Sequence, residues 1–309
     1  MIFKILFTGL TFCLISINFS YGQSQEIFQK SINKARSGQY TSIDFRQFSN
    51  DSDISESLSL LESFQDDSVE SVRSRVYNLL GRLGPYIKKA ADREKSVELL
   101  TKGLTDQSSG IVGNVLDFLS DYKADDFNQT ARQNLLNSVR TGTTHYAQLI
   151  KIAGFVNMDG LSDQLKTIAQ SDSLSAQIKW SVKLAQARIG DIEAIDFIMT
   201  RIGRYPVNDK FMYQILPTVL YIKNKRVAGL LSEIILDDTK NCRSADKEQD
   251  EATICGYQAL EYMARIVKNF PVPADSEGYL ETDDYIQALQ TTRDWLRTDP
   301  EFVIDKTIY

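Results

Sequence analysis

Apolar residues recur every three or four positions in the stretch DDSVESVRSRVYNLLGRLG, which covers residues 66–84. They are Val69, Val72, Val76, Leu79, Leu80 and Leu83. On an α-helix this spacing places all of them on one face. Asp66 and Asp67 precede the pattern, where acidic side chains can cap free amides, and Gly84 followed by Pro85 is typical of a helix end. The stretch therefore predicts an amphipathic helix.

The preceding stretch, residues 54–64, has its own apolar face and is separated from this helix by a short turn. Two such helices are expected to pack against each other in antiparallel orientation. Similar pairs follow along the chain, and their second helices are expected to begin near residues 68, 108, 143, 174, 207 and 250. Tandem helix pairs of variable length are typical of repeat proteins. We therefore expect an all-α fold, an α-α superhelix or solenoid of about six antiparallel helix pairs.

Two further helices, at about 25–37 and 283–297, are expected to cap the ends of this array. Residues 23–309 would then form a single domain. The segments TSIDF, at 41–45, and FVIDKTIY, at 302–309, have strand-like composition, and we expect them to pack irregularly on the ends. The stretches 237–250 and 269–282 are predicted loops. Pro217, inside an apolar helical pattern, is expected to kink or split its helix.

Residues 1–22 differ in character from the rest of the chain. Lys4 precedes about 15 mostly apolar residues, and the small residues Ser20 and Gly22 follow them. This arrangement is typical of a cleaved secretory signal peptide, and the apolar run is short for a membrane span. We therefore expect a secreted or periplasmic protein that is not inserted in a membrane after cleavage.

The chain has 35 Lys and Arg residues against 41 Asp and Glu residues, a net charge of −6. Removal of residues 1–22 takes away one lysine and changes this charge to −7. An acidic chain without a basic run argues against nucleic acid as the partner. Beyond the leader, two cysteines remain, Cys242 and Cys255, and an oxidising compartment favours a disulfide between them. The alternative is two separate buried thiols.

The motifs of common enzymes and metal sites are absent from the sequence. The chain has one histidine, His145, which excludes sites built on a histidine pair. It lacks the glycine-rich phosphate loops, the nucleophile elbow of hydrolases and the calcium-binding loop. Pairs of adjacent acids, such as Asp66 and Asp67, do not face each other across a cleft. We expect no catalytic residue, no metal site and no cofactor.

The helical pattern at 66–84 returns at 172–190 without a gap. Val72, Arg73, Leu83 and Gly84 correspond to Ile178, Lys179, Ile189 and Gly190. An Asp before the helix, an apolar-basic pair within it and an apolar-glycine end resemble the second helix of HEAT repeats. The resemblance implies an α-solenoid that binds proteins. It also implies that Asp67, Arg73, Asp172 and Lys179 belong to a structural ladder between repeats.

These features lead to one functional expectation. The protein would be a non-enzymatic scaffold or adaptor that binds another protein on the curved surface of its repeats. The alternatives are an accessory or regulatory subunit of an envelope enzyme, and an envelope hydrolase with a carboxylate site in its groove. Phe211, Tyr213 and Tyr221 cannot all share one helix face, so at least one is a candidate anchor for the partner.

Overall fold

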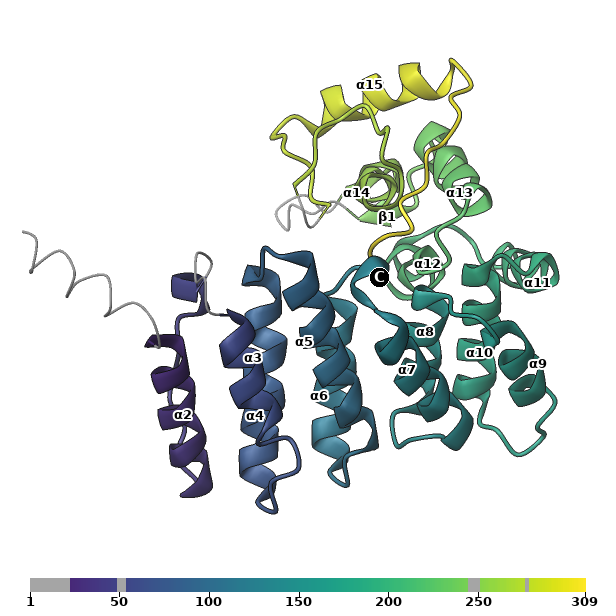
Figure 1. The fold of residues 1–309 in the computed structure, drawn as a ribbon. Helices are drawn as coiled ribbons and strands as arrows, with labels where there is room; N and C mark the ends of the chain where they lie inside the picture. Colours follow the sequence, from purple (N-terminus) through teal and green to yellow (C-terminus); the bar gives the residue numbers. More distant parts are fainter. Residues whose placement is uncertain (1–22, 49–53, 244–250, 276–277) are drawn as a thin grey trace, which may run out of the picture. The chain divides into compact units, whose positions relative to one another are not determined.

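The computed structural model describes residues 23–48, 54–243, 251–275 and 278–309, and it is mostly helical (Figure 1). These ranges contain fourteen α-helices and one two-stranded sheet. The predicted leader, 1–22, lies outside them. In these ranges no helix combines the length and the hydropathy that a membrane crossing requires. The chain divides into two compact units, Met1–Ile152 and Ala153–Tyr309.

The first unit is built from two rows of helices. Its α-helices are α2 (Gln23–Arg36), α3 (Ile54–Glu62), α4 (Glu70–Leu83), α5 (Ala90–Lys102), α6 (Ser109–Ser120) and α7 (Gln129–Thr141), and it contains most of α8 (Tyr146–Val156). Helix α4 packs between α2 and α6, whereas α5 packs between α3 and α7, and the two rows contact each other. Short 3₁₀ turns follow α2, α4, α5 and α6: η1 (Phe45–Phe48), η2 (Gly84–Tyr86), η3 (Gly103–Thr105) and η4 (Ala124–Asp126).

The helix predicted at 66–84 is observed as α4, and its apolar face forms core. Val72, Val76, Leu79, Leu80 and Leu83 are fully buried. Val69 lies one residue before the helix in extended conformation, and its amide donates to Asp67 Oδ1 at 2.9 Å. Asp67 therefore satisfies an amide at the helix entrance, as an acidic residue in this position is expected to do.

The second unit contains helices of the same design and a small hairpin. Its elements are α9 (Leu161–Ala169), α10 (Ala176–Ile189), α11 (Ile192–Ile202), η5 (Phe211–Ile215), α12 (Leu216–Leu220), α13 (Lys225–Leu236), β1 (Cys242–Arg243), β2 (Ala252–Thr253), α14 (Gly256–Ile266) and α15 (Tyr285–Leu296). Helix α10 packs on α9 and α11, and α14 packs on α13 and α15. Strand β1 lies in the stretch predicted to be a loop, because its pairing with β2 is too short to appear as a pattern in the sequence.

Pro217 splits its helix, as its position in the sequence predicts. The five residues before Leu216 form the π-helical turn η5, and the Leu216 amide donates to the Phe211 carbonyl five residues earlier. Proline has no amide proton and its ring clashes with the carbonyl four residues before it, here that of Tyr213. The wider turn accommodates this loss before α12 continues.

Helices α8 and α10 approach closely at Gly154. A Cβ atom there would lie 2.5 Å from the Tyr221 hydroxyl and 2.8 Å from the Cα of Ala185. We expect Gly154→Ala to lower the free energy of unfolding by about 1–3 kcal/mol, because overpacking forces the backbone apart. The control is Gly229→Ala in α13, where the new methyl group meets no atom within 4 Å. Urea denaturation of both variants checks this, and equal midpoints would contradict the close packing.

Candidate functional site

An arginine near the start of α4 joins three chain segments in the first unit. The Arg73 guanidinium donates to both carboxylate oxygens of Asp106, at 2.8 and 3.1 Å, and to the Asp67 carbonyl oxygen at 2.9 Å. Such a bidentate pair is among the stronger charge-assisted contacts in proteins. The side chains of Arg73 and Asp106 are only 15% and 5% exposed. Arg73 therefore ties the entrance of α4 to the entrance of α6.

The same contact recurs on both sides of this pair. Arg36 pairs with Asp67, and Arg93 pairs with Asp126 at 2.9 Å while donating to the Ile87 carbonyl. We call these three pairs the arginine–aspartate ladder. Arg93 and Asp126 were not predicted as ladder residues from the sequence, although their separation of 33 residues equals that of Arg73 and Asp106. That repeated spacing is the signal that identifies them.

Of the residues predicted to form a ladder, Asp67 and Arg73 take part in these pairs, whereas Asp172 and Lys179 make a different contact. Lys179 Nζ donates to the backbone carbonyl of Asp172, at 3.4 Å, and both side chains are exposed. In the described part of the chain neither forms an ion pair with another repeat. Asp172 lies six residues before Ile178, whereas Asp67 lies five residues before the corresponding Val72, so the two turns differ in length. Ser175 caps α10 instead.

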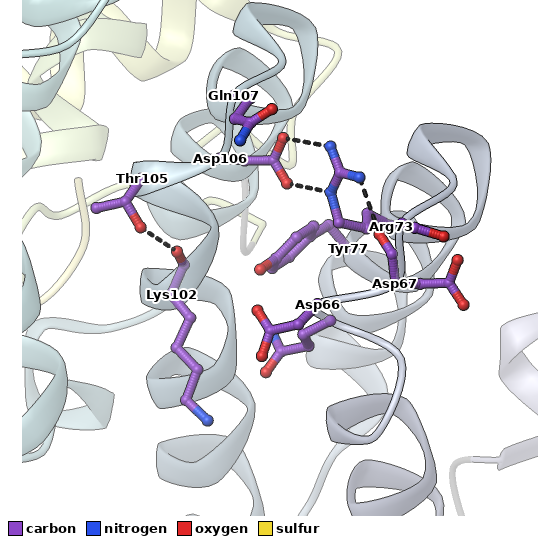
Figure 2. Close-up of a pocket in the computed structure, with 10 residues that line it drawn as sticks. Asp66, Asp67, Arg73, Tyr77, Lys102, Thr105, Asp106 and Gln107 are labelled. Atoms are coloured by element: carbon purple, nitrogen blue, oxygen red, sulfur yellow. Dashed lines mark hydrogen bonds and ion pairs between the residues drawn. The ribbon is translucent and has the colours of Figure 1, made fainter.

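A polar hollow of about 340 Å³ lies beside the Arg73–Asp106 pair (Figure 2). Its lining includes Tyr77, Lys102 and Gln107. Most of its charges are neutralised within the unit, because Arg73 holds Asp106, Arg36 holds Asp67, and Lys102 pairs with Glu62 at 2.6 Å. Such a set of mutually paired side chains stabilises the joint between helices and offers little free charge to a ligand.

The pairing has an electrostatic consequence for Asp106. Its burial acts to raise the pKa, but hydrogen bonds from Arg73 and from the Ser108 amide outweigh it, so the pKa is lowered from 3.8. A carboxyl whose folded pKa is lowered contributes stability above its ordinary pKa, and this stability is lost as the pH falls through the folded value.

We expect Arg73→Met to lower the free energy of unfolding by about 3 kcal/mol at pH 7, because it leaves the buried Asp106 carboxylate without its cation. The difference between variant and wild type should shrink at acidic pH, as the Asp106 carboxylate becomes protonated and no longer needs a cation. Urea denaturation at neutral and at acidic pH tests this. The control is Arg226→Met, which breaks the exposed pair with Asp196 and should cost less than about 1 kcal/mol. Equal losses in the two variants would contradict the assignment.

The single histidine lies at a helix joint of the first unit. His145 Nε2 is 2.9 Å from the Ser109 carbonyl oxygen and 3.2 Å from the Ser109 hydroxyl. These contacts connect the entrance of α8 to the first turn of α6. The arginine–aspartate ladder contains no pair among the described residues that joins these two helices. Among the described residues, no group of three or more histidine, cysteine or acidic side chains is arranged to hold a metal ion.

A larger hollow, of about 1050 Å³, lies in the second unit. We call it the tyrosine hollow; it is lined by Tyr213, Cys242, Arg243, Thr253, Ile254, Cys255, Tyr257, Gln258, Glu261, Asp283, Asp284, Tyr285 and Ile286. It brings together η5, the β1–β2 hairpin, α14 and the start of α15. The exposed fractions are 58% for Tyr213, 36% for Tyr285 and 74% for Ile286. These side chains offer apolar area to a ligand.

Of the three aromatic residues among which at least one was expected to be an anchor, Tyr213 lines this hollow. Phe211 is only 2% exposed and Tyr221 only 8%, so these two belong to the core and not to a binding surface. Tyr221 packs at the close approach of Gly154, and its ring lies 5.4 Å from the Arg188 guanidinium. The π-helical turn changes the phase of the helix at this point, which is why the apolar spacing did not reveal the side that each ring faces.

The disulfide between Cys242 and Cys255 forms part of the wall of the hollow. It joins β1 to the residue before α14, and Cys242 pairs with Thr253 in the hairpin. Each strand is only two residues long, so the hairpin has little pairing of its own. The disulfide therefore fixes this wall against α14.

The floor of the hollow contains a buried carboxylate. Glu261 is 8% exposed and accepts hydrogen bonds from the Tyr285 hydroxyl and, at 3.2 Å, from the Leu280 amide. The hydrogen bond to Glu261 and, to a smaller extent, burial raise the pKa of Tyr285 to about 12. This tyrosine is therefore a neutral donor at ordinary pH. Glu261 thus accepts hydrogen bonds from neutral groups, and no basic side chain among the described residues forms an ion pair with it.

No family model matches the chain, and no curated protein matches it.

Proposed function

We propose that this chain is a HEAT-like α-solenoid and acts as a non-enzymatic scaffold that binds another protein. The two rows of helices in the first unit and the arginine–aspartate ladder support the solenoid part of the proposal. In the second unit, the packing of α10 against α11 and of α13 against α14 supports the same arrangement. The proposed single array would extend over residues 23–309.

The proposed location is outside the cytoplasm, in the periplasm or the secreted fraction. Two features support it: the leader-like composition of residues 1–22 and the disulfide between Cys242 and Cys255. Disulfides persist in oxidising compartments and are rare in the cytosol.

The observation that carries the binding function is the exposed apolar rim of the tyrosine hollow. Tyrosine supplies a large contact area with few rotatable bonds, and it is enriched among residues that dominate protein interfaces. Tyr213, Tyr285 and Ile286 gather around one concave site rather than being scattered over the surface. A concave site with an apolar rim and a few polar groups suits a segment of a partner protein.

The test is affinity capture of a partner by immobilised protein, followed by measurement of its affinity for variants. We expect Tyr213→Ala to weaken binding about thirtyfold, the effect of losing an interface anchor worth about 2 kcal/mol. Its melting temperature should stay unchanged because the side chain is exposed. The control is Tyr205→Ala, which removes a tyrosine that is 45% exposed and does not line the hollow. Equal affinity of the two variants would refute the proposed site.

A further inference from the structure

The charges around the tyrosine hollow define the chemistry of its ligand; this inference rests on the proposed function. Among the described residues, the hollow is lined by three carboxylates, those of Glu261, Asp283 and Asp284, and by one cation, Arg243. Arg243 is directed to an acid outside the lining, since its guanidinium lies 3.9 Å from Asp209 and its amide donates to the same carboxylate. The hollow therefore has an excess of negative charge.

The three carboxylates differ in how they are used by the fold. Asp284 caps α15 by accepting from the Gln287 amide at 2.9 Å. Glu261 is buried and receives only a hydroxyl and an amide. Asp283 is exposed, and no described residue forms a hydrogen bond or ion pair with its side chain. Glu261 and Asp283 are thus two acceptors that a cation from outside could still neutralise.

A buried carboxylate is costly unless it is paired, and hydrogen bonds from neutral groups offset only part of this cost. A lysine or arginine that enters the hollow would supply the missing charge to Glu261, which still has acceptor capacity on both oxygens. The exposed rings of Tyr213 and Tyr285 add faces that attract a cation, with Ile286 beside them. The net charge of −6 further favours the approach of a basic partner.

We infer that the tyrosine hollow binds a basic peptide segment of a partner protein, with an apolar side chain among Tyr213, Tyr285 and Ile286 and a flanking lysine or arginine at Glu261 and Asp283. The apolar contact supplies most of the affinity. The charge contact determines which segments are accepted, because an acidic segment would place like charges together.

Selection from a phage-displayed library of random short peptides on the immobilised protein tests this inference. We expect enriched peptides to combine an aromatic or aliphatic residue with at least one neighbouring lysine or arginine. For a synthetic peptide of that sequence, Tyr213→Ala should weaken binding about thirtyfold. Asp283→Asn should weaken it about threefold to fivefold, the range of an exposed charge pair, and added salt should remove this difference. The matched controls are Tyr205→Ala and Asp163→Asn, which change exposed residues outside the hollow.

The possible outcomes separate this inference from the proposed function. Enriched peptides that are neutral or acidic, yet lose binding in Tyr213→Ala, would overturn the basic-segment inference and leave the binding function standing. Enriched peptides that bind Tyr213→Ala as tightly as wild type would refute both. An absence of enrichment overturns the inference, and the capture experiment with Tyr213→Ala then decides the function independently.

Discussion

Replacement of Arg188 by methionine is expected to lower the free energy of unfolding of the second unit by about 4 kcal/mol, because a buried side chain loses its hydrogen bonds to three carbonyl oxygens at once. Arg188 is 3% exposed and donates to the carbonyl oxygens of Tyr221, Lys306 and Ile308, at 2.5, 3.1 and 2.8 Å. Its guanidinium also lies 5.4 Å from the rings of Phe155 and Tyr221. Methionine can fill a similar volume but cannot donate to any of these carbonyls.

Arg188 is an unusual core residue because, in the described ranges, no acidic side chain forms an ion pair with it. Burial lowers its pKa, while the charges that Tyr221, Tyr309 and Asp305 can carry act to raise it. The carbonyl oxygens and the two rings therefore replace a counter-ion. Two of the carbonyls belong to the segment 302–309, so Arg188 holds that segment onto α10 and the chain after α12.

Urea denaturation followed by circular dichroism measures the expected loss. The matched control is Arg201→Met, since Arg201 is exposed and lies 5.6 Å from the Trp180 ring without any hydrogen bond to a buried carbonyl. It should change stability by less than about 1 kcal/mol. In Arg188→Met the amides of 302–309 should also exchange faster with solvent. Unchanged exchange and an unchanged midpoint would contradict the role of Arg188.

Removal of the disulfide is expected to have the second-largest effect. Cys242 and Cys255 are 13 residues apart, and closing a loop of this size stabilises the fold by about 3 kcal/mol in the chain-entropy description. The double variant Cys242→Ala/Cys255→Ala should lose about this amount, and it should also lose peptide binding, because the hairpin wall of the tyrosine hollow depends on the bridge.

Treatment of the wild-type protein with a dithiol reductant provides the control for this prediction. Reduction should reproduce the lower stability of the double variant, and the same reductant should leave the variant itself unchanged. The measurement is thermal unfolding with and without reductant. If the oxidised protein, the reduced protein and the variant all unfold at the same temperature, the disulfide does not stabilise the fold and the prediction is wrong.

The sequence predicted local structure well where apolar residues recur with the helical period. The apolar pattern that ends at Leu83 corresponds to α4, and the related pattern at 172–190 corresponds to α10. Both helices end at a glycine, as the pattern indicated. The proline effect at Pro217 was likewise local, because it follows from a missing amide proton and a ring clash within one helical turn.

Contacts between side chains of different helices were harder to predict. Asp67 and Arg73 were identified as ladder residues, but the carboxylate that receives Arg73 is Asp106 of the next helix pair. A comparison of similar stretches shows which residues occupy equivalent positions in two helices. An ion pair instead joins residues that are close in the folded protein and occupy different positions in their stretches. For the same reason the pair of Arg93 and Asp126 was missed, because neither residue stands out within its own stretch.

The tyrosine hollow was predicted only through Tyr213. Its walls come from η5, the β1–β2 hairpin, α14 and α15, and their meeting depends on how the helices pack. Glu261 lies within a helix pattern, where a glutamate normally indicates a solvent-facing position, yet it is buried. Nothing in its neighbours along the chain distinguishes it from an exposed acid. Its significance follows only from Tyr285 and Leu280, which approach it in the folded protein.

Amide hydrogen exchange of the protein, with and without the partner or peptide that it captures, tests the central claim most directly. The account predicts slower exchange on binding in three segments, around Tyr213 in η5, around Tyr257 in α14 and around Tyr285 in α15, with little change in α9 and α11. Protection confined to α9 and α11, with unchanged exchange in the three segments of the tyrosine hollow, would contradict it.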